Sequence, residues 1–170
     1  LAIDPNNQQA LAGLTNIVAR YGQLARSSLQ QAKLKQALQR VNNGLSIEPQ
    51  NNDLMKLKSR INSAIKKQQN IQGLLQQARQ RVEQERWFDT TDSAVQRYQQ
   101  VLALEPDQPQ AKLELEQLMA EFYRRVDELI ATKNYDVAEE SLQQALYFFA
   151  DDDRLLSLML ELESLKPVIE

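Results

Sequence analysis

The feature that most constrains the fold is a match of the chain with itself at a shift of 101 residues. The match needs no gap, and it pairs apolar residues with apolar residues over roughly sixty positions. The paired residues include Leu1 and Leu102, Pro5 and Pro106, Ala10 and Ala111, Leu14 and Leu115, Ile17 and Leu118, Tyr21 and Phe122, Ala25 and Val126, Ala37 and Ala138, Val41 and Leu142, and Leu54 and Leu155. A self-match of this length indicates internal duplication, which is typical of chains built from stacked repeats.

Within each copy, a short amphipathic helix is followed by a turn. The clearest example runs from Ala94 to Pro106, where apolar residues three and four apart share one side of a helix and Pro106 ends it. The pattern recurs before Pro49 and before Ala150, and a further turn stands at Pro5. The turns are 44, 57 and 44 residues apart. This spacing predicts one array over 1–170 with helix-pair units at about 6–49, 50–106 with an insertion, and 107–150, followed by a C-terminal helix at 151–166.

The apolar periodicity predicts a long first helix and a shorter second helix in each copy. The expected helices cover residues 8–31, 34–47, 108–132 and 135–149. The stretch 52–86 is predicted to be either one long helix or two helices that meet near Gln68–Asn70.

Residues 87–92 are the least helical part of the chain, because Thr90, Thr91 and Asp92 are good helix caps. We expect Trp87 and Phe88 to anchor this turn against a neighbouring helix. A platform on which a ligand stacks is the alternative for these two aromatic side chains.

The second helix of each unit resembles that of the tetratricopeptide (TPR) family, in which a small residue, an aromatic residue, a small residue and a closing proline follow one another. Ala94, Tyr98 and Pro106 match that pattern, with Val101 in the second small position. Partial matches in the other two units are Ala37, Val41 and Pro49, and Tyr135, Ala138, Leu142, Ala145 and Ala150. The period is longer than the family's usual one, and the family's Trp-Leu-Gly signature in the first helix is absent.

The resemblance implies an all-α fold, in which helix-turn-helix repeats stack into a right-handed TPR-like α-solenoid with elongated first helices. In that family the first helices line a concave wall that receives a peptide or a partner helix. By resemblance, the partner-binding residues are Asn16, Arg20, Gln117, Glu121 and Arg124. The segment 86–98 also resembles divergent repeats of multidomain bacterial proteins that carry kinase-like or sulfatase-modifying-factor-like domains.

The composition argues against catalysis. The chain has no cysteine and no histidine, which excludes a thiolate nucleophile, a histidine base and the usual zinc sites. Four glycines that stand apart cannot form a phosphate-binding loop. The carboxylate clusters at Glu139–Glu140 and Asp151–Asp153 are typical of solvated faces and helix caps. We therefore expect no enzyme activity, no metal and no cofactor.

Charge is distributed unevenly along the chain. Between Leu54 and Val82 every charged residue is basic, whereas the C-terminal end is rich in acids. A surface for an anionic partner is predicted on this basic stretch, at Lys56, Lys58, Arg60, Lys66 and Lys67. Nucleic acid is disfavoured, because the chain is acidic overall and lacks aromatic residues among these bases.

These observations predict a non-catalytic scaffold that binds a protein, peptide or helix on its concave surface. The alternatives are a structural spacer and an accessory regulatory domain of a kinase-like or modifying-enzyme-like bacterial protein. We expect the chain to be a fragment of a longer protein, without a transmembrane segment, and to self-associate through an uncovered face of its first helix. The absence of cysteine is equally compatible with the cytoplasm and the periplasm.

Overall fold

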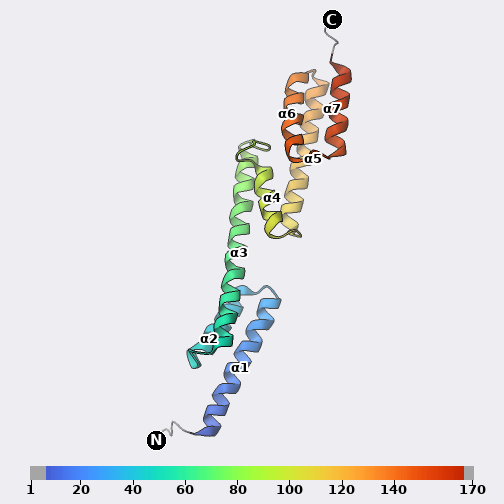
Figure 1. Ribbon diagram of the computed structural model, residues 1–170. Helices are drawn as coiled ribbons and strands as arrows, with labels where there is room; N and C mark the ends of the chain where they lie inside the picture. The colour runs from blue at the N-terminus through green and yellow to red at the C-terminus, as the bar shows by residue number, and fades with distance from the viewer. Residues whose placement is uncertain (1–6, 167–170) are drawn as a thin grey trace. The chain divides into compact units, whose positions relative to one another are not determined.

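The computed structural model describes residues 7–166, and these residues fold as helices joined by turns, with no strand among them (Figure 1). The helices are α1 (Gln8–Gln30), α2 (Leu34–Ile47), α3 (Asn52–Glu83), α4 (Ala94–Leu104), α5 (Pro109–Ala131), α6 (Tyr135–Phe148) and α7 (Asp153–Leu165). The all-α class is therefore confirmed. The turn predicted at Pro5 lies outside the described residues, while those at Pro49, Pro106 and Ala150 each follow a helix.

The duplication seen in the sequence is also present in the helix boundaries. Helix α5 begins and ends 101 residues after α1 (8 to 109 and 30 to 131), and α6 begins and ends 101 residues after α2 (34 to 135 and 47 to 148). The caps agree as well: Asn7 and Gln108 each accept a hydrogen bond from the backbone N–H three residues later. The two copies therefore form the same helix pair from different side chains.

Each long helix ends in the same backbone motif. Ala32, Glu85 and Lys133 follow α1, α3 and α5 and adopt positive φ angles of 55°, 57° and 61°. In each case the next N–H donates to a carbonyl five residues earlier, which is the Schellman arrangement. The three long helices thus end in the same way, although none of them places glycine at the left-handed position.

Helix α3 is one continuous helix of 32 residues. Of the two alternatives for the stretch 52–86, the single helix is therefore confirmed and the break near Gln68–Asn70 does not occur. The physical reason is that residues 64–72 contain no proline, and each residue can keep its helical hydrogen bond. The chain forms two compact units, residues 1–70 and 71–170, and the boundary between them falls within α3.

The first unit packs α2 on α1 and both on the first part of α3. Its core consists of Ala25, Ala37, Val41, Leu57 and Ile61. The helices approach closely at glycine: a Cβ on Gly44 would lie 2.6 Å from Leu54 Cδ1, so the absent side chain makes room for this leucine.

The second unit packs each helix on the next one, α4 on α5, α5 on α6 and α6 on α7. Its core joins α4, through Tyr98 and Val101, to Leu118 and Phe122 of α5. Leu142 extends this core on α6, and buried leucines of α7 close it. Neighbour-on-neighbour packing is what a repeat array requires. The solenoid itself and its right-handed sense stay predictions.

Candidate functional site

The segment 84–93 between α3 and α4 is held by backbone and side-chain hydrogen bonds. The N–H of Ala94 donates to Arg86 O at 2.9 Å, and the N–H of Val95 donates to Trp87 O at 3.3 Å. The indole N–H of Trp87 donates to Val82 O at 3.2 Å, which ties the ring to the last turn of α3. These bonds give a loop without regular structure a defined shape.

Asp92 fixes the other end of this loop. Its carboxylate pairs with Arg81 at 2.6 Å, with Arg97 at 2.8 Å and with Arg86 at 3.4 Å. The hydrogen bond from Arg81 is the main cause that lowers the pKa of Asp92, and Arg97 adds to it. Ser93 then caps α4 in a reciprocal capping box with Gln96.

Phe88 fills the space under the loop. It is 4% exposed and meets Phe122 of α5 edge to face, with ring centroids 4.7 Å apart. Its centroid lies 6.3 Å from that of Phe148 and 6.5 Å from that of Phe149, both at the end of α6. The expectation that Trp87 and Phe88 anchor the turn is confirmed, because both are buried against other elements.

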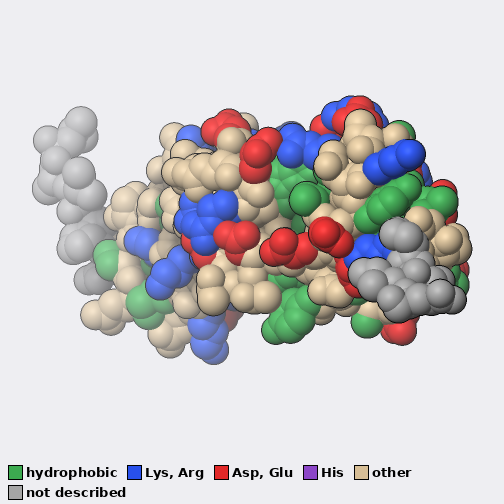
Figure 2. All heavy atoms as spheres, turned by 90° about the horizontal axis from the view of Figure 1, so that it is seen from above, with side chains coloured by type: hydrophobic (Ala, Val, Ile, Leu, Met, Phe, Trp, Pro, Cys, Tyr) green, Lys and Arg blue, Asp and Glu red, His purple; other side chains and the backbone are tan. Residues whose placement is uncertain are grey.

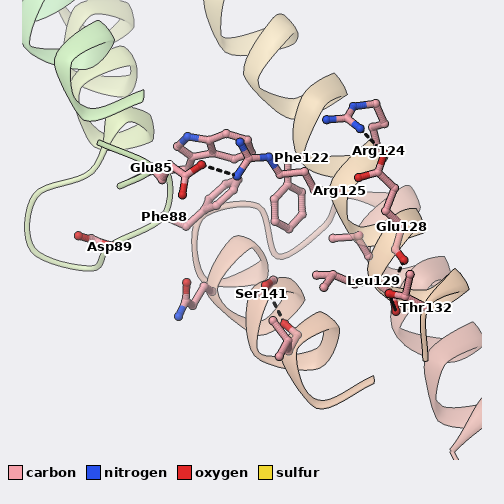
Figure 3. A pocket seen from close by; sticks show the side chains of 14 residues that line it. Glu85, Phe88, Asp89, Phe122, Arg124, Arg125, Glu128, Leu129, Thr132 and Ser141 are labelled. Atoms are coloured by element: carbon pink, nitrogen blue, oxygen red, sulfur yellow. Dashed lines mark hydrogen bonds and ion pairs between the residues drawn. The ribbon is translucent and has the colours of Figure 1, made fainter. Parts of the chain in front are cut away.

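A pocket of about 590 Å³ opens beside these aromatic rings (Figure 3). Its walls come from the loop, from α5 and from α6. The lining residues are Glu85, Trp87, Phe88, Asp89, Phe122, Arg124, Arg125, Val126, Glu128, Leu129, Thr132, Val137, Ser141 and Gln144. A volume of this size lies within the range of small-ligand and side-chain pockets.

Apolar and polar groups occupy different parts of the pocket. In Figure 3 the rings of Phe88 and Phe122 lie next to one another, and Leu129 lies farther along α5. Val137 on α6 is 54% exposed, so its side chain is available to a ligand. Ser141 donates its hydroxyl hydrogen to Val137 O at 2.7 Å, which leaves the hydroxyl oxygen free to accept another hydrogen bond.

Arg125 organises the charged rim. Its guanidinium carbon lies 4.2 Å from the centroid of the Trp87 ring, within cation–π range. The same side chain pairs with Glu85 at 3.0 Å and with Glu121 at 3.3 Å. The guanidinium therefore covers one face of the indole, which limits stacking by a ligand on that face.

Arg124 and Glu121, both predicted as partner-binding residues, pair with each other at 2.6 Å on α5. Arg124 also pairs with Glu128 one turn later. The hydrogen bond from Arg124, followed by that from Arg125, holds the pKa of Glu121 at about 2. The structure thus brings these two predicted residues together and places Arg124 on the wall of the pocket.

Gln117 and Glu121 line a second, smaller pocket of about 420 Å³ between α3, α4 and α5. There Arg79 of α3 binds Glu114 of α5 with both its Nε and its Nη2, and the Nη2 contact is 2.6 Å long. The Tyr98 hydroxyl donates to the same carboxylate at 3.2 Å. Burial, followed by the charge of Glu114, raises the pKa of Tyr98, so the hydroxyl stays protonated and remains a donor.

The other two predicted partner-binding residues belong to the first unit. Asn16 and Arg20 are both exposed on α1, and Arg20 donates to Gln23 at 3.4 Å. They line neither of the pockets described above.

The five predicted anion-binding residues all lie on α3, but they do not form one surface. At about 100° per residue, Lys56, Arg60 and Lys67 fall within about 40° of one another, whereas Lys58 and Lys66 point to other sides of the helix. None of the five forms an ion pair with another residue in the described range 7–166. The residues that share a side make a narrow basic stripe.

Most of the pocket was not predicted. The sequence pointed to three of its lining residues, namely Trp87 and Phe88 in the least helical stretch and Arg124 among the predicted partner-binding residues. Val137 and Ser141 carry no such signal, because their places in the wall depend on how α6 packs on α5.

Within residues 7–166, no group of three or more histidine, cysteine, aspartate or glutamate side chains could hold a metal ion. No described helix is long and apolar enough to cross a membrane.

Comparison with known proteins does not identify a relative. No family model, no curated protein and no solved structure matches this chain.

Proposed function

We propose that the chain is a non-catalytic binding module, and that the pocket between the loop 84–93, α5 and α6 receives a large apolar side chain of a protein partner. The observation that carries the proposal is a preformed pocket of about 590 Å³ with Phe88 and Phe122 in its walls. A rigid aromatic wall loses little entropy when it receives a side chain, and such pockets take the anchor residues of partner segments.

The polar rim is suited to a peptide rather than to an anion. Arg124 and Arg125 lie at the pocket, but each is already paired with carboxylates, through Glu121, Glu128 and Glu85. The free acceptor oxygen of Ser141 can instead receive a peptide N–H. The proposed ligand is therefore a short segment with a large apolar anchor and without a requirement for negative charge.

The test uses Trp87, the single tryptophan of the chain, as a reporter in the pocket wall. Peptides are selected from a random phage-displayed library on the folded chain, and their binding is then measured by titration of the Trp87 fluorescence. Val137→Arg places a charge at the mouth of the pocket, and we expect it to weaken selected peptides at least tenfold, equivalent to about 1.4 kcal/mol.

Leu113→Arg is the matched control, because Leu113 is 53% exposed, like Val137 at 54%, and lines neither pocket. This control should bind selected peptides as the wild type does. Peptides that bind all three proteins equally, or a library that yields no binder, would count against the pocket as the site.

A structural spacer is the second candidate, and one observation favours it. Helix α3 continues for 32 residues, about 48 Å at 1.5 Å per residue, and its residues 66–70 are all exposed. Gln68→Pro would interrupt this helix at a cost of about 3 kcal/mol. A spacer would lose its function in this variant, whereas peptide binding to the second unit would persist.

A further inference from the structure

The N-terminal part of α1 carries an apolar stripe that the described residues do not cover. Leu11, Leu14 and Ile17 are 50%, 46% and 47% exposed, although they continue the stripe that buries Val18 and Ala25. The cause is length: α1 has 23 residues and α2 only 14, so α1 extends about 14 Å beyond its partner.

The second copy of the helix pair shows what such an extension does when a neighbour is present. Helix α5 is also 23 residues long and also extends beyond the 14-residue α6. There α4 packs on it, and Leu118, the counterpart of Ile17, is 4% exposed. The stripe on α1 is therefore a helix-binding face that lacks its helix among residues 7–166.

The charge beside this face limits which partner helix fits. Helix α1 carries two basic residues, Arg20 and Arg26, and no acidic residue. Arg20 follows Ile17 by three residues and borders the stripe, whereas Glu48 and Asp53 lie on another side of α1, beside Thr15 and Ala19. Arg20 stands where the second copy has Glu121. A partner helix for α1 should therefore carry acids beside its apolar residues.

Helix α7 of the same chain has that chemistry on its exposed side. Leu156 and Leu160 are 42% and 67% exposed, and spacings of three and four place Asp153 and Glu163 on the same side. The basic residue of α7, Arg154, turns to α5 instead, where it lies over the Tyr123 ring at 4.2 Å and pairs with Asp127 at 3.5 Å. Figure 2, which views the whole molecule from above Figure 1, shows several acidic side chains next to apolar ones on that face.

We propose that two copies of this chain associate head to tail, with the apolar stripe of α1 in one copy packed on Leu156 and Leu160 of α7 in the next. Because α1 is basic and α7 is acidic, the attraction between them favours contact of α1 with α7 over contact of α1 with α1 or of α7 with α7. Such a contact uses a different face on each copy and leaves one of each face free, so assemblies lengthen as concentration rises. The contact does not involve the pocket and does not depend on its function.

The test is complementation between two variants, followed by sedimentation velocity and by light scattering coupled to size exclusion. Leu14→Glu disables the α1 face and Leu160→Glu disables the α7 face, each at a solvent-exposed position where folding is retained, as circular dichroism at 222 nm verifies. The wild type should form dimers and longer species, and each variant alone should be monomeric. An equimolar mixture should form a 1:1 dimer and nothing larger, because each variant keeps the face that the other lacks.

Ala12→Glu is the charge-matched control, because Ala12 is exposed on α1. It adds the same negative charge to α1 on the opposite side of the helix from Leu14 and should still assemble. Raising the salt concentration from 50 mM to 500 mM should weaken assembly of the wild type, because screening reduces attraction between exposed charges.

Three outcomes would overturn the proposal. The first is a wild-type chain that stays monomeric at all concentrations. The second is a Leu160→Glu variant that dimerises alone, which would indicate a symmetric contact between two α1 helices. The third is a mixture of the two variants that stays monomeric although the wild type assembles.

Discussion

The α1–α2 pair and the α5–α6 pair have the same helix lengths and the same boundaries, yet they bury different parts of their first helix. Ile17 is 47% exposed in the first pair, and its counterpart Leu118 is 4% exposed in the second. The difference lies in the neighbours, because α4 packs on α5 and no described element covers the equivalent part of α1. An apolar stripe predicts that a segment is helical, but the burial of that stripe depends on whether another helix packs on it.

The two pairs also differ where their helices approach most closely. The second helix has Gly44 in the first copy and Ala145 in the second, and both are buried. Leu54 and Leu155 are the corresponding leucines of the third helix. At this contact the two copies therefore differ by one methyl group on the second helix.

The largest effect should come from Leu118→Ala, with Ile17→Ala at the corresponding position of the first copy as its comparison. Leu118→Ala removes a buried side chain and should lower the free energy of unfolding of the second unit by about 3 kcal/mol. Ile17→Ala removes an exposed side chain from a helix and should change stability by less than about 0.5 kcal/mol. Urea denaturation, followed by Trp87 fluorescence and by circular dichroism, measures both. The comparison is made at a concentration at which the chain is monomeric. Equal effects of the two substitutions there would mean that the α1 stripe is covered within a single copy.

A smaller effect is expected from exchanging glycine and alanine between the copies. Ala145→Gly should destabilise by about 2 kcal/mol, because it loses helix propensity and a buried methyl group. Gly44→Ala should be close to neutral, within about 0.5 kcal/mol. The gain in helix propensity is offset there by displacement of Leu54 Cδ1, which a new Cβ would approach to 2.6 Å. Thermal unfolding of the two variants measures both changes, and a Gly44→Ala variant as damaged as Ala145→Gly would show that Leu54 cannot move.

The smallest effect should be a dependence on pH at Glu121, where the first copy has Arg20. The neighbouring arginines hold the pKa of Glu121 at about 2 in the folded chain, below its ordinary value of 4.5. A lowered folded-state pKa stabilises the fold above pH 4.5, and this contribution is lost as the pH falls toward 2. The urea midpoints of the wild type and of Glu121→Gln should therefore differ at pH 7 and converge near pH 2.

Glu116→Gln is the control for this titration. Glu116 lies on the same helix and forms no ion pair with another described residue, so its replacement should leave the midpoint almost unchanged at both pH values. A difference between wild type and Glu121→Gln that stays constant with pH would contradict an ionic role for Glu121.

Much of the helical layout follows from the sequence, and the reason is local. Helix α2 has the predicted bounds, α1 and α6 each end one residue earlier than predicted, and α5 is one residue shorter at both ends. Apolar spacing and cap residues such as Asn7 act over a few neighbouring positions. The bounds of a helix can therefore be predicted without knowing which other helices pack against it. The pocket could be predicted only in part, because Trp87 and Phe88 come from one segment while Val137 and Ser141 come from another.

The sequence by itself determined the helix class, the duplication at 101 residues and the irregular loop at 87–92, because periodicity and caps are properties of neighbouring residues. Only the tertiary structure decided that Arg125 covers Trp87 and that Ile17 and Leu118 differ in exposure. These outcomes depend on contacts between segments far apart in the chain, and the free energy of such contacts is set by which surfaces meet.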